Sequence, residues 1–273
     1  MKGVIFMFLS YFGMEFNPFD KTIDTKFAFE TNDLKVMNNR LNYLKENPGI
    51  ALFTGNPGMG KTFAIRNFMN SLNPNLFKCV YISMSSLTVH EFYKQLAISL
   101  GIIPEHKKID IYKQIQETIV DLVNNRKIKV IICIDEAQYL KTDIINDLKI
   151  LSNFEMDSKN YFTLILTGQP VLNNVLNRNV HEALRQRITI SYNFSGISKD
   201  ELANYINTRL SIAHGNSNIF TPQAIESIYN SCNGAIRIAN NIITKSLIIA
   251  SANDKNIIDN DIIMEAYNDL ALG

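Results

Sequence analysis

The sequence predicts an α/β fold in which a five-stranded parallel sheet is followed by a small all-helical domain. Two observations predict this class: five apolar runs of strand length alternate with helical patterns up to residue 192, and only helical patterns follow residue 196. The third observation is a glycine-rich phosphate-binding pattern directly after the first apolar run. We therefore expect an N-terminal segment at 1–30, an α/β domain at 31–195 and a helical domain at 196–273.

The first elements of the α/β domain follow from apolar spacing. A helical pattern at 31–46 precedes the short apolar run at 50–53, which is typical of a buried strand. A helix is expected at 61–71 and a second strand at 77–83. This order of strand, helix and strand indicates a parallel pair joined by a helical crossover.

The middle of the domain carries clear boundary signals. Thr88 is expected to cap a helix, because Glu91 three residues later completes a capping box and Gly101 provides a stop. An amphipathic helix is expected at 109–125. The continuous apolar run at 130–134 then predicts a central parallel strand that is covered on both faces.

The remaining elements complete the sheet and open the helical domain. We expect a helix at 142–154 and strands at 161–167 and 188–192. After residue 196 the sequence predicts four helices. The first runs from a capping box at 198–201 to about residue 213, the second begins at Thr221-Pro222, and the others begin near 234 and 259.

The composition limits the class of protein. The chain has 273 residues, of which 46% are hydrophobic, and a net charge of +1. The apolar share excludes a disordered chain, and the charge balance excludes a strongly basic DNA-coating protein, although it leaves room for a local basic patch. Three separated cysteines and four unclustered histidines predict neither a disulfide framework nor a zinc site.

The N-terminal apolar run at 4–9 resembles the core of a signal peptide. No small-residue cleavage site follows it, so we do not expect an export signal. The run is also far shorter than the ~18 residues of a membrane span, and no other stretch reaches that length. We therefore expect a cytoplasmic protein without a membrane span.

Residues 55–62, GNPGMGKT, match the phosphate-loop pattern G-x-x-x-x-G-K-[ST]. Backbone N–H groups of such a loop surround phosphate oxygens, and the helix that follows adds its dipole. Lys61 is expected at the β and γ phosphates, and the Thr62 hydroxyl is expected on Mg²⁺. The alternative, a glycine-rich turn that matches by chance, is disfavoured by the strand before it and the helix after it. The expected nucleotide-binding residues here are Gly55, Asn56, Pro57, Gly58, Met59, Gly60, Lys61, Thr62 and Phe63.

The acidic pair Asp135-Glu136 closes the central strand. Acidic groups at the carboxyl end of a parallel strand lie at the ligand edge of the sheet. We expect Asp135 to hold the Mg²⁺ shell and Glu136 to orient and polarise the attacking water. The alternative is an acidic turn without chemistry. Residues 135–138 also spell the helicase-type box DEAQ, but such a helicase needs two α/β domains, and only about 80 helical residues follow the fifth strand.

These motifs resemble those of AAA+ ATPases of the ExeA, TniB and TnsC type, which are P-loop nucleoside triphosphatases. Four further segments carry the resemblance, which extends over residues 11–270. They are Phe12-Gly13-Met14 with Asn17-Pro18-Phe19, the sensor 1 strand end at 166–170, the arginine-finger segment at 184–188 and the sensor 2 helix at 234–240.

The resemblance implies ATP and Mg²⁺ as ligands and assigns roles to several residues. Thr167, or Gln169 near it, would sense the γ-phosphate. Arg187 would be the finger that reaches a neighbouring subunit's nucleotide, with Arg185 as the rival. Arg237 would be sensor 2. The N-terminal segment at 1–30 would contribute to the nucleotide site, with residues 16–19 near the adenine.

For the biological role, the resemblance offers two classes. Transposition regulators of this family assemble with ATP as rings or filaments on double-stranded DNA, without strong sequence preference, and recruit or activate a transposase. Secretion-type members carry a membrane span and a cell-wall-binding region after the ATPase part, and this sequence stops at Gly273 with neither. We therefore expect a transposition regulator, with a secretion or envelope-assembly ATPase as the alternative and a stand-alone regulatory or defence ATPase as a third possibility.

DNA contacts leave only a weak signal in the sequence. A filament would repeat each basic residue in every subunit, so that a weak patch becomes a continuous surface. For any one of these residues, an ordinary solvated face is the more common explanation. The candidates are Lys94, Lys107, Lys108, Arg126, Lys127 and Lys129.

Overall fold

The structure is a computed structural model, and it describes residues 2–23, 27–83, 87–155 and 158–271. Contacts divide the chain into two compact units. One consists of Met1–Lys35, Pro57–Gly60 and Ser195–Gly273, and the other of Val36–Asn56 and Lys61–Phe194. Met1 and residues 24–26 of the expected N-terminal segment, and residues 272–273 of the expected helical domain, lie outside the described residues.

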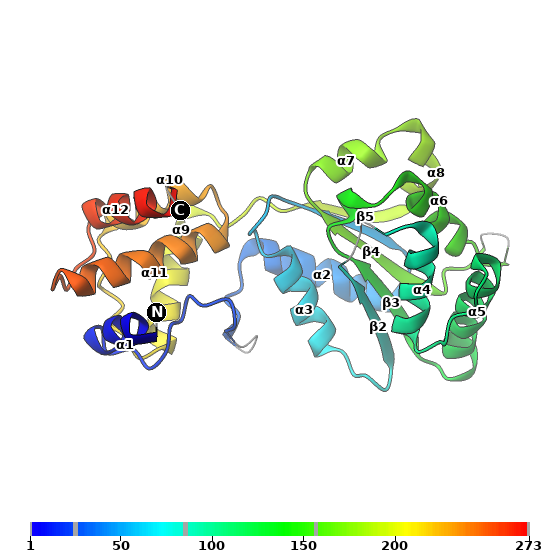
Figure 1. Cartoon of the computed structure of the whole chain (residues 1–273), viewed down its shortest axis with the longest axis horizontal. Coiled ribbons are helices and arrows are strands. Elements are labelled where there is room, and N and C mark those ends of the chain that lie inside the picture. Colours follow the sequence, from blue (N-terminus) through cyan, green and yellow to red (C-terminus); the bar gives the residue numbers. More distant parts are fainter. Residues whose placement is uncertain (1, 24–26, 84–86, 156–157, 272–273) are drawn as a thin grey trace. The chain divides into compact units, whose positions relative to one another are not determined.

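The second unit contains the five-stranded parallel sheet that the sequence predicts (Figure 1). The strand order is β2-β3-β4-β1-β5. The three strands that end next to predicted site residues, β3, β4 and β1, are therefore the inner strands of the sheet. The strands are β1 (Ile50–Thr54), β2 (Phe77–Ile82), β3 (Lys129–Ile134), β4 (Phe162–Gly168) and β5 (Ile188–Asn193).

Helices cover both faces of this sheet. Figure 1 shows α2 and α3 on one side and α4, α5 and α6 on the other. Val130, Ile132 and Ile134 of β3 belong to the core that α4 to α6 cover, whereas the alternate residues point to the opposite face. The helices are α2 (Asn32–Glu46), α3 (Lys61–Ser71), α4 (Val89–Leu100), α5 (Lys108–Val120), α6 (Thr142–Leu151), α7 (Val171–Leu176) and α8 (Glu182–Arg185).

The expected boundary of α4 is confirmed. Thr88 accepts a hydrogen bond from the Glu91 N–H, and the Glu91 side chain accepts one from the Thr88 N–H, so the capping box is complete. Gly101 ends the helix with a φ of 94°, in the left-handed region that glycine adopts without strain. These signals are local in sequence, which is why the sequence reveals them.

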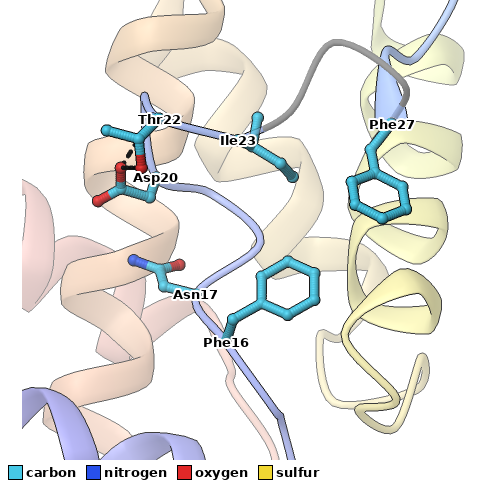
Figure 2. A pocket seen from close by; sticks show the side chains of 6 residues that line it. All are labelled: Phe16, Asn17, Asp20, Thr22, Ile23 and Phe27. Carbon is cyan, nitrogen blue, oxygen red and sulfur yellow. Dashed lines mark hydrogen bonds between the residues drawn. The ribbon is translucent and has the colours of Figure 1, made fainter.

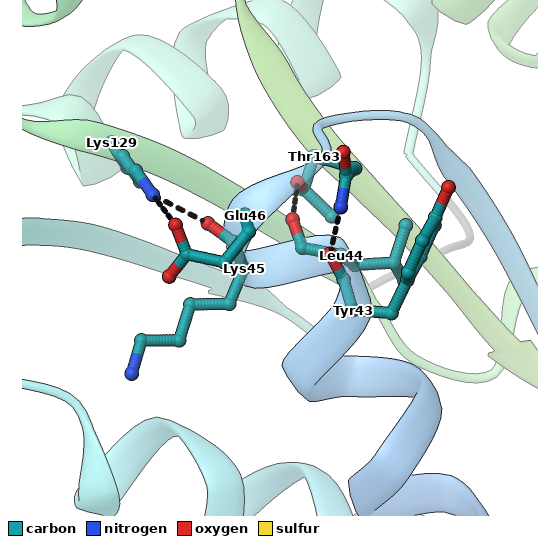
Figure 3. Close-up of polar contacts among 7 residues, drawn as sticks. Tyr43, Leu44, Lys45, Glu46, Lys129 and Thr163 are labelled. Carbon is teal, nitrogen blue, oxygen red and sulfur yellow. Dashed lines mark hydrogen bonds and ion pairs between the residues drawn. The ribbon is translucent and has the colours of Figure 1, made fainter.

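The last turn of α2 is fastened by side chains from elsewhere in the second unit (Figure 3). Buried Thr163 of β4 donates to the Leu44 carbonyl oxygen at 3.1 Å. Lys129 of β3 donates to the Lys45 carbonyl oxygen at 2.9 Å and pairs with the Glu46 carboxylate at 2.6 Å. Carbonyl groups that a helix end leaves unpaired therefore find partners on the sheet.

The first unit is helical, and its core includes the N-terminal segment. Phe8 and Phe12, at the end of α1 (Lys2–Tyr11), and Met14 are buried in the same cluster as Leu210 and Ile243. The apolar run near the N-terminus therefore belongs to a helix of the folded unit. The other helices of the unit are α9 (Lys199–Ile212), α10 (Pro222–Cys232), α11 (Ile236–Ala252) and α12 (Asn260–Ala271).

Among the described residues, no helix is both long enough and apolar enough to cross a bilayer.

Candidate active site

The phosphate loop joins β1 to α3, as the sequence predicts. Gly58 and Gly60 have φ angles of 82° and 99°, which a side-chain-bearing residue adopts only with strain. The side chain of Lys61, the first residue of α3, is 5% exposed. Its Nζ donates to the carbonyl oxygens of Gly55 at 2.7 Å and Asn56 at 3.1 Å. A phosphate bound in this loop would meet an ammonium group that is already held in place.

Strand order brings the acidic pair to this loop. Strand β4 lies between β1 and β3, and Thr54 of β1 is in register with Gly168 of β4. Thr62, at the start of α3, donates to Asp135 Oδ2 at 2.7 Å. The two predicted Mg²⁺ ligands are therefore in direct contact.

Asp135 is buried and accepts four hydrogen bonds. Burial raises the pKa of this carboxyl group, but the bonds from Thr167, Thr62 and Tyr81, with the Glu136 N–H, outweigh burial and leave the pKa below its ordinary value. The group is therefore held as a carboxylate. The Tyr81 hydroxyl donates to Oδ2 at 2.8 Å, the Glu136 N–H donates to Oδ1 at 2.9 Å, and the Thr167 hydroxyl also donates to Oδ1.

Tyr81 is a site residue that sequence reasoning missed. It lies on β2 and is paired with Cys133 of β3, which precedes Asp135 by two residues. Burial and the bond to Asp135 raise the pKa of its phenol, so the hydroxyl keeps its proton and remains a donor. One signal could have revealed it: Tyr81 is a polar residue near the carboxyl end of β2, and β2 pairs with β3, the strand that leads to Asp135.

Glu136 adopts a left-handed backbone conformation, with a φ of 52°. Residues other than glycine rarely adopt it, and such strain is common at functional sites. The carboxylate accepts a hydrogen bond from Gln138 Nε2 at 2.6 Å. Glu136 is therefore held beside Asp135 by both its backbone and its side chain.

The donor set at Thr62 and Asp135 fits Mg²⁺. Both offer oxygen, which is the ligand that this ion prefers, and Asp135 is ionised. No group of three or more acidic, histidine or cysteine side chains gathers as a metal cage in the described part of the chain. Mg²⁺ in phosphate sites is held by one or two protein groups together with water and the phosphates, and that pattern agrees with this arrangement.

Residues 44–176 match the protein family described as AAA domain. Over this range the chain is similar to an AAA domain. It is also 28% identical over 270 residues to "General secretion pathway protein A" of Aeromonas hydrophila, an alignment that covers 96% of this chain and 48% of the relative. The chain thus spans about half the length of that relative, and the resemblance predicted from the motifs is confirmed.

Solved structures support the same fold. Cdc6p from Pyrobaculum aerophilum superposes with a TM-score of 0.70 at 17% identity, covering 91% of this chain and 69% of that one. Drosophila ORC bound to DNA gives a TM-score of 0.69 at 16% identity, covering 95% of this chain and 65% of that one. At such low identity these likenesses concern the fold alone, and they confirm the predicted P-loop fold of the AAA+ type.

The two sensor 1 candidates of the AAA domain lie at the end of β4. Thr167 is fully buried and bonds to Asp135, so its hydroxyl is directed at the acidic pair. The Gln169 N–H donates to Gln138 Oε1 at 3.0 Å. Both candidates therefore connect to the acidic pair, Thr167 directly and Gln169 through Gln138.

The two finger candidates have different surroundings. Arg187 donates to the Lys149 carbonyl oxygen at 3.0 Å and to Ser152 Oγ at 3.2 Å, both at the end of α6. Arg185 donates to the Asn177 carbonyl oxygen at 3.2 Å, just after α7. Arg187 thus stabilises a helix end of its own chain, a role that the sequence did not suggest.

Arg237, the sensor 2 candidate, opens α11 in the first unit. Its N–H donates to the carbonyl oxygen of Gly58, in the loop segment that belongs to the same unit, at 3.2 Å. A Cβ atom on Gly58 would lie 3.0 Å from the Arg237 Cβ. The glycine therefore permits this close approach of the loop to the helix.

The N-terminal segment forms a pocket of about 400 Å³ in the first unit (Figure 2). The rings of Phe16 and Phe27 stack with centroids 6.2 Å apart and 27° between their planes. Asn17 and Asp20 add polar atoms to the wall. The predicted contribution of this segment to the nucleotide site is not tested by these contacts and stays a prediction.

Proposed function

We propose that this chain binds ATP with Mg²⁺ and hydrolyses it to ADP and phosphate. The observation that carries the proposal is the convergence of Thr62, Asp135 and Glu136 at the carboxyl ends of β1 and β3. A phosphate loop and an acidic pair in this relation match the needs of phosphoryl transfer, which depends on positioning and on stabilising charge.

Each side chain has a defined task in this proposal. The Lys61 ammonium would leave the loop carbonyls and contact the β and γ phosphates. Thr62 and Asp135 would hold Mg²⁺, which supplies charge neutralisation between the phosphate groups. Glu136 would orient the attacking water and polarise it as a base. Thr167 or Gln169 would then report the γ-phosphate to the acidic pair.

The base of the nucleotide also has a candidate site. The pocket between Phe16 and Phe27 presents ring faces, on which a purine can stack, together with polar atoms of Asn17. This supports the prediction that the N-terminal segment contributes to nucleotide binding. Replacing Phe16 by Ala would then weaken ATP binding more than tripolyphosphate binding.

The test separates binding from chemistry. Lys61→Ala should weaken ATP binding and abolish turnover, because charge-assisted contacts to the phosphates are lost. Glu136→Gln keeps the size of the side chain, so ATP should still bind while phosphate release falls by roughly 10²–10⁴. Normal phosphate release by well-folded Glu136→Gln would refute the role of Glu136, and normal ATP affinity of Lys61→Ala would refute the loop assignment.

For the biological role, similarity favours the secretion-type alternative. The relative at 28% identity is named for general secretion, and it aligns with 96% of this chain. The end of the sequence at Gly273 carries no weight here, because the chain spans only 48% of that relative. A transposition regulator that recruits a transposase is the other candidate.

The DNA-binding part of the transposition role has limited support from the charges. Three of the six basic candidates form ion pairs, namely Lys108 with Asp147, Arg126 with Asp121 and Lys129 with Glu46. Such pairs reduce the charge available to phosphates. If the chain nevertheless assembles on DNA, double-stranded DNA should stimulate ATP hydrolysis, and rising salt should reverse the effect. If ATPase activity does not change when DNA is added at about 50 mM salt, the secretion-type role is favoured.

A further inference from the structure

The proposed chemistry gives roles to Asp135 and Glu136 of the DEAQ segment but none to Gln138, the polar residue that ends it. It lies in a short 3-10 turn, Ala137–Tyr139, directly after the acidic pair. Its Nε2 donates to Glu136 Oε2 at 2.6 Å, and its Oε1 accepts from the Gln169 N–H at 3.0 Å. The side-chain amide therefore bridges the expected base to the end of β4.

The bridge continues to the phosphate loop through a single peptide group. The Gln169 N–H and the Gly168 carbonyl belong to the same peptide plane. The Gly168 oxygen accepts from the Gly55 N–H, at the opening of the phosphate loop, at 3.2 Å. A continuous chain of hydrogen bonds thus runs from Gly55 through the peptide 168–169 and Gln138 to Glu136, and bonds linked in this way polarise one another.

Gly168 is required for this arrangement. A Cβ atom at this position would lie 2.5 Å from Gln138 Oε1 and 3.0 Å from Leu172 Cδ2. A side chain at residue 168 would therefore displace the amide. Gly168 is therefore needed because a side chain would not fit, and not because of its backbone conformation.

The geometry also fixes which way the amide faces. A backbone N–H can only donate, so the atom facing Gln169 must be the amide oxygen, and the NH₂ group is directed at Glu136. A bond from this group to a carboxylate is charge-assisted and stronger than a neutral one. It holds Oε2 of Glu136, and no group in the described part of the chain donates to Oε1, which can accept a water molecule.

We infer that Gln138 is a positioning residue for hydrolysis, which fixes the Glu136 carboxylate and couples its orientation to the phosphate loop through the peptide 168–169. This inference rests on the proposed ATP hydrolysis at Glu136. A base whose orientation is set by a third group is a recurrent arrangement, and misplacing a reacting group by about 1 Å can cost roughly 10²-fold in rate. Gln138 itself need not touch the nucleotide.

The experiment compares Gln138→Met, which keeps the length of the side chain and removes both hydrogen bonds, with Tyr139→Phe in the same turn. Tyr139 is exposed and lies outside the hydrogen-bond chain. We expect kcat of Gln138→Met to fall about 10–100-fold while the Kd for ATP stays within about twofold of the wild type. Tyr139→Phe should keep the wild-type kcat.

A second measurement asks whether Gln138 acts through Glu136. In the Glu136→Gln background, adding Gln138→Met should change the residual rate by less than about twofold, because the group that Gln138 positions is already disabled. Amide hydrogen exchange at Gln169, followed without nucleotide, should become about tenfold faster in Gln138→Met. This readout does not depend on activity.

The outcomes distinguish the two claims. Absence of ATP turnover by the wild type would overturn the proposed function, and a normal rate for Glu136→Gln would refute the role of Glu136 as the base. If Glu136→Gln is inactive as expected, three results would overturn the inference alone: a kcat of Gln138→Met within twofold of wild type, rate losses that multiply in the double variant, or unchanged exchange at Gln169.

Discussion

Asp135 is a buried carboxylate that its hydrogen-bond donors keep ionised. Its hydrogen bonds come from α3, β2 and β4 as well as from the next peptide, so four parts of the second unit depend on its charge. Donors of this kind outweigh the cost of burial. The same bonds that keep the group ionised also hold the strand tips together.

The lowered pKa of Asp135 has a consequence for stability. A carboxyl group whose pKa is lower in the folded state stabilises the fold above its ordinary pKa of about 3.9, and this contribution is lost as the pH falls through the folded value. Asp135→Asn removes this titration. We therefore expect the free energy of unfolding of the wild type to fall more steeply below pH 4 than that of Asp135→Asn.

Urea unfolding followed by circular dichroism at pH 6, 5, 4 and 3 measures this difference. Glu91→Gln is a useful comparison, because the pKa of that exposed carboxyl is also lowered, first by a backbone and then by a side-chain hydrogen bond to Thr88, but outside the site. If the stability of the wild type and of Asp135→Asn falls in parallel as the pH is lowered, the claim that the fold lowers the pKa of Asp135 is wrong.

Sequence reasoning predicted the candidate site residues whose positions depend on local spacing. The phosphate loop and the acidic pair are contiguous segments, and their partners Thr62 and Asp135 are in contact as the motifs require. Tyr81 and Gln138 were missed because their roles depend on contacts between segments. Such contacts are decided by strand order and register, which spacing along one segment does not encode.

At the level of elements, the end of α2 illustrates how the sheet supports a helix. Its last carbonyl groups are paired with Thr163, Lys129 and Asn47. Thr163 is 2% exposed, so water cannot readily replace its hydroxyl. The helix end is thereby tied to two strands.

Thr163→Val tests this tie, because valine has a similar shape but no hydroxyl. The Leu44 carbonyl would lose its donor, and we expect the free energy of unfolding to fall by about 1–2 kcal/mol. Lys129→Met removes an exposed ion pair and the donor to the Lys45 carbonyl, but water can reach this half-exposed side chain, so the change should cost less than about 1 kcal/mol. Equal or reversed effects in urea titrations would show that Thr163 does not support α2.

Most predicted strands and longer helices of the α/β domain agree with the structure, because apolar periodicity and caps are local. Two bounds differ: the helix expected at 142–154 ends at Leu151, and the last turn of the helix expected at 109–125 is a π-helix, Asp121–Asn125. Helix α1 was not predicted as part of the fold. Its apolar residues look like a leader core in isolation, but Phe8 and Phe12 are buried against the helical unit. The short helices α7 and α8 were missed as well, since six and four residues are too few for a periodic pattern.

For the whole molecule, we propose that the ATPase site is completed by an arginine from a second copy. Activity should then rise more than linearly with protein concentration. Mixing a finger variant with Glu136→Gln should restore part of the activity, because some interfaces pair an intact Glu136 with an intact arginine. Strict proportionality to concentration and no recovery on mixing would exclude a finger in trans.

The same experiment decides between Arg185 and Arg187. Arg187→Ala should also lower stability, because the end of α6 loses its charged donor to Lys149 and Ser152. Arg185→Ala should leave stability nearly unchanged, as it donates to one exposed carbonyl group. The finger is the residue whose loss is recovered on mixing, whatever its effect on stability.

The most direct test of the proposed ATPase site is a crystal structure of the chain with Mg²⁺ and a slowly hydrolysed ATP analogue. We predict that Lys61 Nζ has moved from the Gly55 and Asn56 carbonyls to the γ-phosphate, and that Thr62 Oγ1 has left Asp135 to ligate the metal. Glu136 should face the water in line with the γ-phosphate. A nucleotide bound elsewhere, with the bonds of Lys61 and Thr62 intact, would contradict the account.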